Sequence, residues 1–303
     1  MTILVLGNAT VDLSYEVERL PVAGETLLAS SKFIDAGGKG LNQAVVAHRA
    51  GAQVQFCAAI GNDAHAEIIA KHVMAEELDA GFLLRHAGPT DESLIFVASS
   101  GENAIVSTAG AARGLTPEAV RAALARLTSG DTLLMQGNLN QEITHRALET
   151  ARARSVFAIL NPAPIAFDYT GLWPFVDIVI VNEVEAAALG SGTDLDSAAL
   201  RLLDAGCRSV IVTLGGAGAR LYERDYNMHV TAPLVTAVDT TGAGDVFCGV
   251  LAAGIAQDMA MNSVIRWSVA AASLSVTRRG TGAAFPSRDE LRELRAHANA
   301  AAQ

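Results

Sequence analysis

The segment DTTGAGDVF, residues 239–247, places a carboxylate among glycines just before an apolar helical pattern. Glycines at the start of a helix let backbone N–H groups approach an anion, which the positive end of the helix dipole also favours. Gly242, Ala243 and Gly244 would supply those amides. Asp245 would then take a proton from an alcohol while the amides stabilise a transferred phosphoryl group. The competing interpretation is that Asp245 merely caps the helix.

The usual nucleotide-binding loops are absent from the sequence. No Gly-Lys-Ser or Gly-Lys-Thr follows the glycines of 239–247, and GNATVD at 7–12 does not have the spacing of a dinucleotide fingerprint. A second glycine cluster, AGGKGLNQAVVA at 36–47, precedes another helical pattern. Alone, that cluster is equally typical of an ordinary turn.

Composition and charge exclude several classes of protein. The 303-residue chain carries a net charge of −10 with scattered Lys and Arg, which argues against a nucleic-acid partner. Its apolar runs are shorter than the roughly 20 residues needed to span a bilayer, and the N-terminus has no basic leader with a cleavage site. We therefore expect a cytoplasmic protein without a membrane partner. Three isolated cysteines and seven dispersed histidines form no disulfide or transition-metal pattern.

Strand and helix patterns alternate along the chain. Many of the apolar runs are continuous, as expected for strands that are buried on both faces of a sheet. This alternation predicts an α/β fold with a doubly wound, mostly parallel sheet and helices on both faces. The expected strands are 2–6, 53–60, 131–136, 155–160, 177–181 and 208–214. The expected helices are 40–50, 63–78, 117–127, 141–153, 183–189, 195–205, 243–257, 262–277 and 287–300.

Two stretches, 11–35 and 93–108, lack helical patterning. They predict short strands, with a hairpin around SSGEN at 99–103 in the second stretch. Because hairpins inserted into a parallel α/β fold often form a separate small sheet, we expect these stretches to cover a site; surface decoration is the alternative. The sequence contains no interdomain linker or internal repeat, so residues 1–303 are expected to form a single domain.

Five motifs in order resemble the ribokinase-like branch of the PfkB carbohydrate kinases. They are GGKGLNQAVVAHRAGA at 37–52, NPAP at 161–164, NEVEA at 182–186, TLGGAG at 213–218 and DTTGAGDVF at 239–247. Each motif is weakly specific, but together they cover essentially the whole chain. The resemblance implies an α/β kinase domain with a small β-sheet lid, ATP as donor with Mg²⁺, and a hydroxymethyl group of a sugar or nucleoside as acceptor. It also implies a homodimer formed through the lid.

The resemblance assigns substrate residues by matching motifs. It makes Asp245 the catalytic base and the amides at 242–244 the anion hole. The implied lid would keep water away from the phosphoryl group during its transfer, as such a reaction requires. Without the match, Asp12 would be interpreted as a solvated turn residue. The sugar site would consist of Asp12, Gly38, Lys39 and Asn42, a set of donors and acceptors that suits polyol hydroxyls.

Nucleotide and cation sites are implied in the same way. The glycine turn at 215–218 can equally be a hairpin turn without a ligand. Ala284 stands where relatives commonly carry a serine, so a potassium site would lose one hydroxyl ligand. Nucleotide contacts are implied for Asn182, Thr213, Gly215 and Gly218, with Glu185 organising Mg²⁺ through water. A K⁺ site is implied for Asp239, Thr241, Ser275, Arg278 and Gly280.

Two substrate positions depart from the pattern of the close ribokinases. Thr10 stands where they carry Asn, and Asn138 stands where they carry Glu. Both changes alter the hydrogen bonds offered to sugar hydroxyls, so ribose itself is not assumed. The 136–140 loop has no Lys or Arg, which disfavours a phosphosugar substrate. A free sugar is therefore the leading prediction, and a nucleoside kinase or a sensor without turnover are the alternatives.

Overall fold

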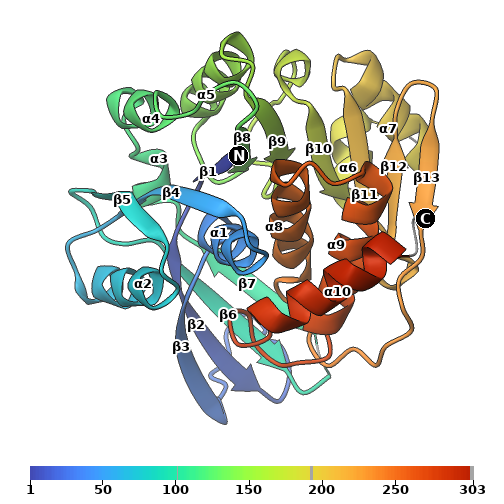
Figure 1. Cartoon of the computed structure of the whole chain (residues 1–303). Helices are drawn as coiled ribbons and strands as arrows, with labels where there is room; N and C mark the ends of the chain where they lie inside the picture. Colours follow the sequence, from blue (N-terminus) through green and yellow to red (C-terminus); the bar gives the residue numbers. More distant parts are fainter. Residues whose placement is uncertain (101, 192–193, 301–303) are drawn as a thin grey trace.

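A computed structural model describes residues 1–100, 102–191 and 194–300 of the chain. Its large sheet has the strand order β13-β12-β11-β10-β9-β8-β1-β4-β5 (Figure 1). Neighbouring strands from β11 to β5 are parallel, whereas β12 and β13 extend one edge in antiparallel fashion. The strands are β1 (Thr2–Leu6), β4 (Gln53–Ile60), β5 (Asp79–Arg85), β8 (Thr132–Gln136), β9 (Phe157–Asn161), β10 (Ile178–Asn182), β11 (Ser209–Thr213), β12 (Ala219–Tyr222) and β13 (Asn227–Val230).

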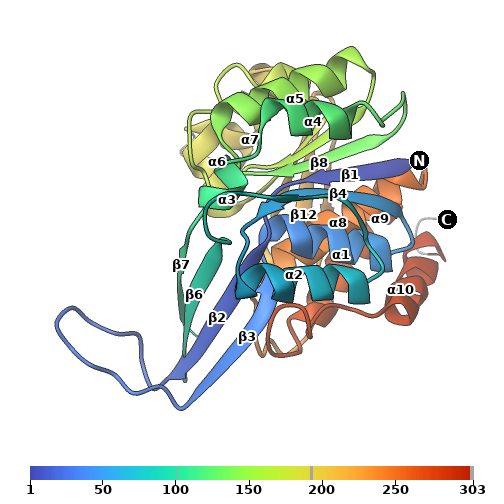
Figure 2. The same ribbon diagram turned by 90° about the vertical axis from the view of Figure 1, so that its left-hand side faces the viewer.

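Helices cover both faces of the large sheet (Figure 2). Side chains of β1 alternate between two buried clusters, because successive residues of a strand point to opposite faces. Ile3 and Val5 belong to the cluster under α1 and α8, and Leu4 and Leu6 belong to the cluster under α4 and α5. One layer consists of α1 (Lys39–Arg49), α2 (Ala64–Ala75), α8 (Ala243–Ala256), α9 (Met261–Ser275) and α10 (Arg288–Ala300). The other contains α4 (Pro117–Leu124), α5 (Gln141–Ala153), α6 (Glu183–Gly190) and α7 (Leu195–Asp204).

A separate small sheet projects from the large one (Figure 2). Its strand order is β3-β2-β6-β7, with β2 and β6 parallel and the outer pairs antiparallel. The predicted hairpin at the second stretch is β6–β7, and Gly101 of its turn lies outside the described residues. The strands are β2 (Thr10–Val17), β3 (Ser31–Gly37), β6 (Glu92–Ala98) and β7 (Asn103–Ser107).

The predicted doubly wound α/β fold and its separate small sheet are confirmed. Two predicted helices, 63–78 and 117–127, are longer than α2 and α4; after α2 the backbone turns at Glu77, which has a left-handed φ of 57°. The strands β5 and β13 and the short helix α3 (Gly110–Arg113) were not predicted. Both strands lie at the edges of the sheet, where one side of the strand has no neighbour and the apolar pattern is weak. No helix among the described residues is long and apolar enough to cross a membrane.

Candidate active site

The carboxylate of Asp245 lies in the first turn of α8 and is 5% exposed. Its Oδ2 accepts a hydrogen bond from Asn42 Nδ2 at 2.9 Å, and its Oδ1 accepts one from Gln43 Nε2 at 3.0 Å. Lys39 Nζ lies 4.0 Å from Oδ1, and the charge of Asp245 raises the pKa of Lys39. All three partners belong to α1, which lies beside α8 (Figure 1). The predicted base and two predicted sugar residues therefore come together at the N-termini of two helices.

The predicted anion hole, residues 242–244, directly precedes this aspartate in the chain. Gly242 has a left-handed φ of 80°, and a Cβ there would lie 2.9 Å from the ring of Phe285. A Cβ on Gly244 would meet no atom within 4 Å, so open space lies in front of this residue. Amides in the first turn have no carbonyl partner four residues earlier in the helix. The amide of Ala243 already donates to the carbonyl of Thr240 at 3.3 Å. The start of α8 is nevertheless open at Gly244, as an incoming anion requires.

Asp12 is a buried residue of β2, which contradicts the interpretation as a solvated turn residue. Thr10 Oγ1 donates to Asp12 Oδ1 at 2.8 Å. Burial raises the pKa of Asp12, and hydrogen bonds from Thr10 and Ser93 oppose this effect. Gly37 leaves room for the carboxylate, because a Cβ at this position would lie 2.1 Å from Asp12 Oδ2. The side chain is therefore held at the junction of the small sheet with α1.

Gly38 and Asn138 are the remaining predicted residues of the sugar site. Gly38 precedes α1 with a φ of 95°, and a Cβ there would lie 2.9 Å from the amide nitrogen of Thr10. Asn138 follows β8, the strand that pairs with β1. Its Oδ1 is buried and has no hydrogen-bond partner among the described residues. A buried acceptor without a partner usually indicates a missing water or ligand.

The predicted nucleotide residues lie at the carboxyl edge of the sheet. Asn182 and Thr213 are register partners on the parallel strands β10 and β11. Asn182 Oδ1 accepts from the amide of Glu185 at 2.8 Å, and Glu185 Oε2 accepts from the amide of Asn182 at 2.9 Å. This reciprocal pair caps α6, so one oxygen of Glu185 is already used.

The glycine turn after β11 is the turn of an antiparallel hairpin, with a 3₁₀ helix at Gly215–Ala217. A Cβ on Gly218 would lie 2.0 Å from the carbonyl oxygen of Val230, so this glycine is required by close backbone packing. Gly215 has a left-handed φ of 53° with open space around it. The turn is therefore a hairpin turn, and open space surrounds its Gly215.

The predicted cation residues are only partly brought together. Asp239 Oδ1 accepts from the amide of Thr241 at 2.9 Å, and Oδ2 accepts from the amide of Gly280 at 3.0 Å. Ser275 Oγ instead donates to the carbonyl of Ala272 at 2.8 Å, and Arg278 forms an ion pair with Glu290. Among the described residues no three His, Cys, Asp or Glu side chains cluster in a way that could hold a metal ion.

Four further residues belong to this region but are not among the predicted ones. Gln43, Gln136 and Asn161 form a buried amide cluster next to Asp245. Asn103 of β7 donates to Thr241 Oγ1 at 3.4 Å, which connects the small sheet to the anion-hole segment. A signal for Gln43 exists in the sequence, because it is a polar residue directly before the apolar run AVVA. Asn103 gives no such signal.

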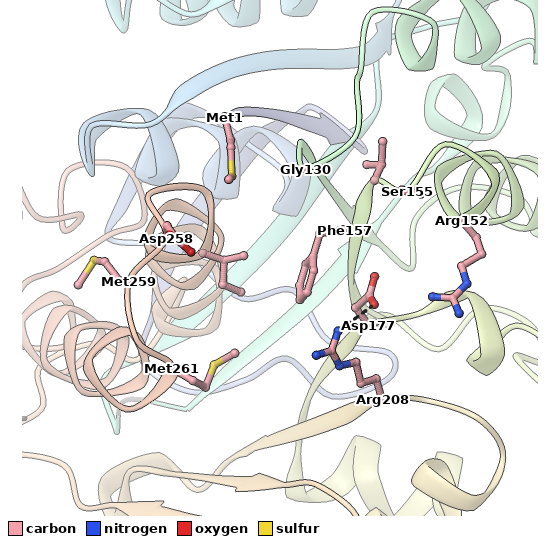
Figure 3. Close-up of a pocket in the computed structure, with 12 residues that line it drawn as sticks. Met1, Gly130, Arg152, Ser155, Phe157, Asp177, Arg208, Asp258, Met259 and Met261 are labelled. Carbon is pink, nitrogen blue, oxygen red and sulfur yellow. Dashed lines mark ion pairs between the residues drawn. The ribbon is translucent and has the colours of Figure 1, made fainter.

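A pocket lies at the opposite edge of the large sheet (Figure 3). Gly130, Asp177 and Arg208 line it, and they precede β8, β10 and β11. Met259 of the connection between α8 and α9 and Met261 at the start of α9 add apolar side chains. None of the predicted site residues lines this pocket. Asn138, Asn182 and Thr213 lie instead at the carboxyl ends of β8, β10 and β11, where ligands of open α/β sheets usually bind.

Comparison with known proteins gives a consistent family. The pfkB family carbohydrate kinases match residues 2–288. The chain is 34% identical to the ribokinase of Haemophilus influenzae, over 98% of this chain and 99% of that one. It is 31% identical to the deoxyribokinase of Salmonella typhimurium, over 97% and 98% of the two chains. A solved structure of Arabidopsis thaliana ribokinase complexed with ribose and ATP has a TM-score of 0.84 at 26% identity, covering 97% of this chain and 98% of that chain. The chain therefore belongs to the pfkB family of carbohydrate kinases, phosphotransferases with an alcohol group as acceptor.

Proposed function

We propose that the protein catalyses ATP-dependent phosphorylation of a hydroxymethyl group on a free sugar, a pentose or a related compound. The observation that carries this proposal is the buried carboxylate of Asp245 beside Asn42 and Lys39, at the open N-terminus of α8. Membership of the pfkB family supports the reaction class. The ribokinase and deoxyribokinase relatives support a pentose as the acceptor.

In the proposed mechanism Asp245 is the general base. Each of its oxygens accepts one amide hydrogen bond and keeps a lone pair that can receive the proton of the sugar hydroxyl. The deprotonated oxygen attacks the γ-phosphorus of ATP, the bond from that phosphorus to the bridging oxygen breaks, and ADP leaves. The amides at 242–244 stabilise the transferred group, and Asp245 then releases its proton to solvent.

We assign sugar recognition to the residues around the junction of β2 and α1. Asp12 offers a carboxylate to sugar hydroxyls, and Thr10 orients it through their hydrogen bond. The unpartnered Oδ1 of Asn138 supports a contact with a sugar hydroxyl there. The sugar site would also use the backbone of Gly38 and the side chains of Lys39 and Asn42.

We assign the nucleotide to the edge formed by Asn182, Thr213, Gly215 and Gly218. The parallel pairing of β10 with β11 and the open surface at Gly215 support this assignment. Mg²⁺ keeps several waters when bound, and the remaining oxygen of Glu185 would hold one of them. Because the reaction consumes ATP, we also propose a cytoplasmic location.

Residues 1–303 are proposed to act as one kinase domain, with the small sheet as a lid formed by about 11–35 and 93–108. Asp12 comes from this sheet, and the contact from Asn103 to Thr241 supports a position over the anion hole. A closed lid would exclude the water that otherwise hydrolyses ATP.

Potassium activation is proposed through the loops that carry Asp239, Thr241, Ser275, Arg278 and Gly280. Both oxygens of Asp239 already accept backbone amides, and Ala284 offers no hydroxyl. A bound K⁺ would therefore rely on backbone carbonyls of these loops. This arrangement predicts a weaker dependence on K⁺ than a site with the full set of side-chain ligands.

A homodimer through the lid is supported by an apolar row on the small sheet. Ile34, Leu13, Leu94 and Val106 are successive register partners, so they lie on one face. Asp12 points to the other face, because it is adjacent to Leu13 in the strand. Ile34 and Val106 are 47% and 68% exposed. The two exposed ends of this row favour contact with another copy of the chain, while Leu13 packs against the core.

The double variant Ile34→Asp/Val106→Asp should be monomeric at concentrations where the wild type is dimeric, because two charges would then be buried in the contact. Sedimentation equilibrium measures the change. The control is Leu200→Asp, which places one charge at a half-exposed leucine of α7. A dimer that survives the double variant would place the interface elsewhere.

Asp245→Asn should lower kcat by at least about 100-fold, because the general base is lost. Binding of ATP and sugar, measured by calorimetry, should stay near the wild-type values. Asp225→Asn makes the same change at an exposed residue and should leave kcat unchanged. Wild-type turnover in Asp245→Asn would remove Asp245 from its proposed role.

Free pentoses should support ADP release with ATP and Mg²⁺, whereas nucleosides should not. A coupled assay over panels of free sugars and nucleosides tests the substrate class, and replacing NaCl by KCl in the same assay tests the cation. Turnover of nucleosides alone would show that the protein is a nucleoside kinase. An absence of turnover with every compound would favour the sensor alternative.

The variant Thr10→Asn/Asn138→Glu should shift the ratio of kcat/KM values toward ribose by at least about tenfold, because it offers the hydrogen-bond pattern of the close ribokinases. The matched control is Thr170→Asn/Asn299→Glu, which changes the same residue types at exposed positions. An unmoved ratio would mean that positions 10 and 138 do not determine selectivity.

A further inference from the structure

The side chain of Gln43 is fully buried and joins three parts of the fold. Its Nε2 donates to Asp245 Oδ1 at 3.0 Å and to Asn161 Oδ1 at 3.3 Å, while its Oε1 accepts from Gln136 Nε2 at 2.7 Å. Gln136 and Asn161 are the last residues of β8 and β9 and are register partners. One amide therefore connects the carboxylate of α8 to the edge of the large sheet.

A main-chain carbonyl determines the direction of this amide chain. Asn161 Nδ2 donates to the carbonyl of Ile180 at 2.9 Å, which leaves Asn161 Oδ1 as an acceptor. Gln43 must turn its Nε2 toward that acceptor and toward Asp245, and it then presents Oε1 to Gln136. If the amide of Gln43 were flipped, its Oε1 would face the acceptor oxygens Asp245 Oδ1 and Asn161 Oδ1, and both hydrogen bonds would be lost. Gln43 is thus a hydrogen-bond donor to the carboxylate and cannot exchange this role.

The backbone is adapted to keep Gln136 in this place. A Cβ on Gly7 would lie 1.9 Å from Gln136 Oε1 and 2.9 Å from the Cα of Gly40. Gln136 is fully buried, and its Oε1 has no hydrogen-bond partner among the described residues. Gln136 is thus fixed beside Gly7 with its Nε2 directed at Gln43.

We propose that Gln43 is a positioning residue for the catalytic base, an inference that rests on the proposed role of Asp245. The terminal torsion of an aspartate is soft, so one hydrogen bond does not hold the plane of its carboxylate. Asn42 supplies one donor, but it is also assigned to the sugar. Gln43 supplies the second donor from the interior, independently of any substrate. A fixed plane keeps a lone pair directed at the reacting hydroxyl.

Gln43→Met keeps the length of the side chain and removes the amide. We expect kcat to fall by about 10- to 100-fold, the scale of a misplaced reacting group, while the KM values for ATP and sugar stay within about twofold of wild type. Gln136→Met releases Gln43 without touching Asp245 and should cause a smaller fall in kcat. The double variant should fall no further than Gln43→Met, because Gln136 acts through Gln43.

The pH profile gives a second readout. A donor to a carboxylate stabilises its ionised form, so the acidic limb of the kcat profile should move to higher pH in Gln43→Met. The charge of Asp245 acts on the pKa values of Lys39 of α1, Asp12 of β2 and Cys248 of α8, and all three groups are unchanged in this variant. A role in packing alone would not move this limb.

Gln257→Met is the matched control at the C-terminal end of α8. It removes a partly buried amide that donates to the carbonyl of Ala50 and accepts from Arg295. This variant should lower the melting temperature without lowering kcat or moving the pH profile. An equal loss of kcat in Gln257→Met and Gln43→Met would reduce the effect to general destabilisation and overturn the proposal.

Unchanged kcat in Gln43→Met, or additive effects of Gln43→Met and Gln136→Met, would also overturn the positioning role. If Gln43→Met does not fold, Gln136→Met takes its place, and an unchanged kcat in Gln136→Met would then overturn the positioning role. Asp245→Asn is measured in parallel. Turnover that survives in Asp245→Asn defeats the assignment of the base itself, whereas turnover lost there but kept in Gln43→Met defeats only the positioning role.

Discussion

The buried carboxylate of Asp245 ties together segments that are about 200 residues apart, and the arrangement of the site follows from it. An ionised group cannot be buried without partners, and here neutral amides of Asn42 and Gln43 cover both of its oxygens. The N-termini of α1 and α8 also meet at this point, so two helix dipoles present their positive ends. Gly249 allows the two helices to lie this close, because a Cβ there would be 2.8 Å from the carbonyl oxygen of Gln43.

This single arrangement accounts for the chemistry of the proposed reaction. In that reaction the same helix turn would offer a base for the alcohol and amides for the phosphoryl group, so proton removal and charge stabilisation would occur side by side. The small sheet contributes Asp12 of β2 and the contact of Asn103 with Thr241, and as the proposed lid it would complete the enclosure. The large sheet contributes through Gln136 and Asn161, which reach Asp245 through Gln43. The helices, the small sheet and the large sheet therefore each contribute residues to the candidate site.

Much of this organisation could be predicted from the sequence. Continuous apolar runs such as 2–6 and 53–60 are visible because these strands are buried on both faces, and Gly242 and Gly244 marked the start of α8 correctly. The edge strands β5 and β13 were missed because only part of their surface is buried. The hydrogen bonds to Asp245 could not be read from the sequence either, since they depend on how α1 packs against α8.

Other residues show where local patterns mislead. Without a family match, Asp12 resembled a turn residue, yet it is buried in a strand, because its neighbours Thr10 and Gly37 make room and hydrogen bonds for it. Conversely, the capping box of Asn182 and Glu185 has a local signature, an Asn followed three residues later by a Glu, that was available in the sequence. Local spacing therefore predicted the elements more reliably than it predicted what individual side chains contact.

The most direct test of the central claim is a crystal structure with the unphosphorylated sugar substrate and a non-hydrolysable ATP analogue bound together. The account predicts the reacting hydroxyl within hydrogen-bond distance of an Asp245 oxygen and the terminal phosphate against the amides of 242–244. A reacting hydroxyl directed at another residue, or a terminal phosphate away from the start of α8, would contradict it.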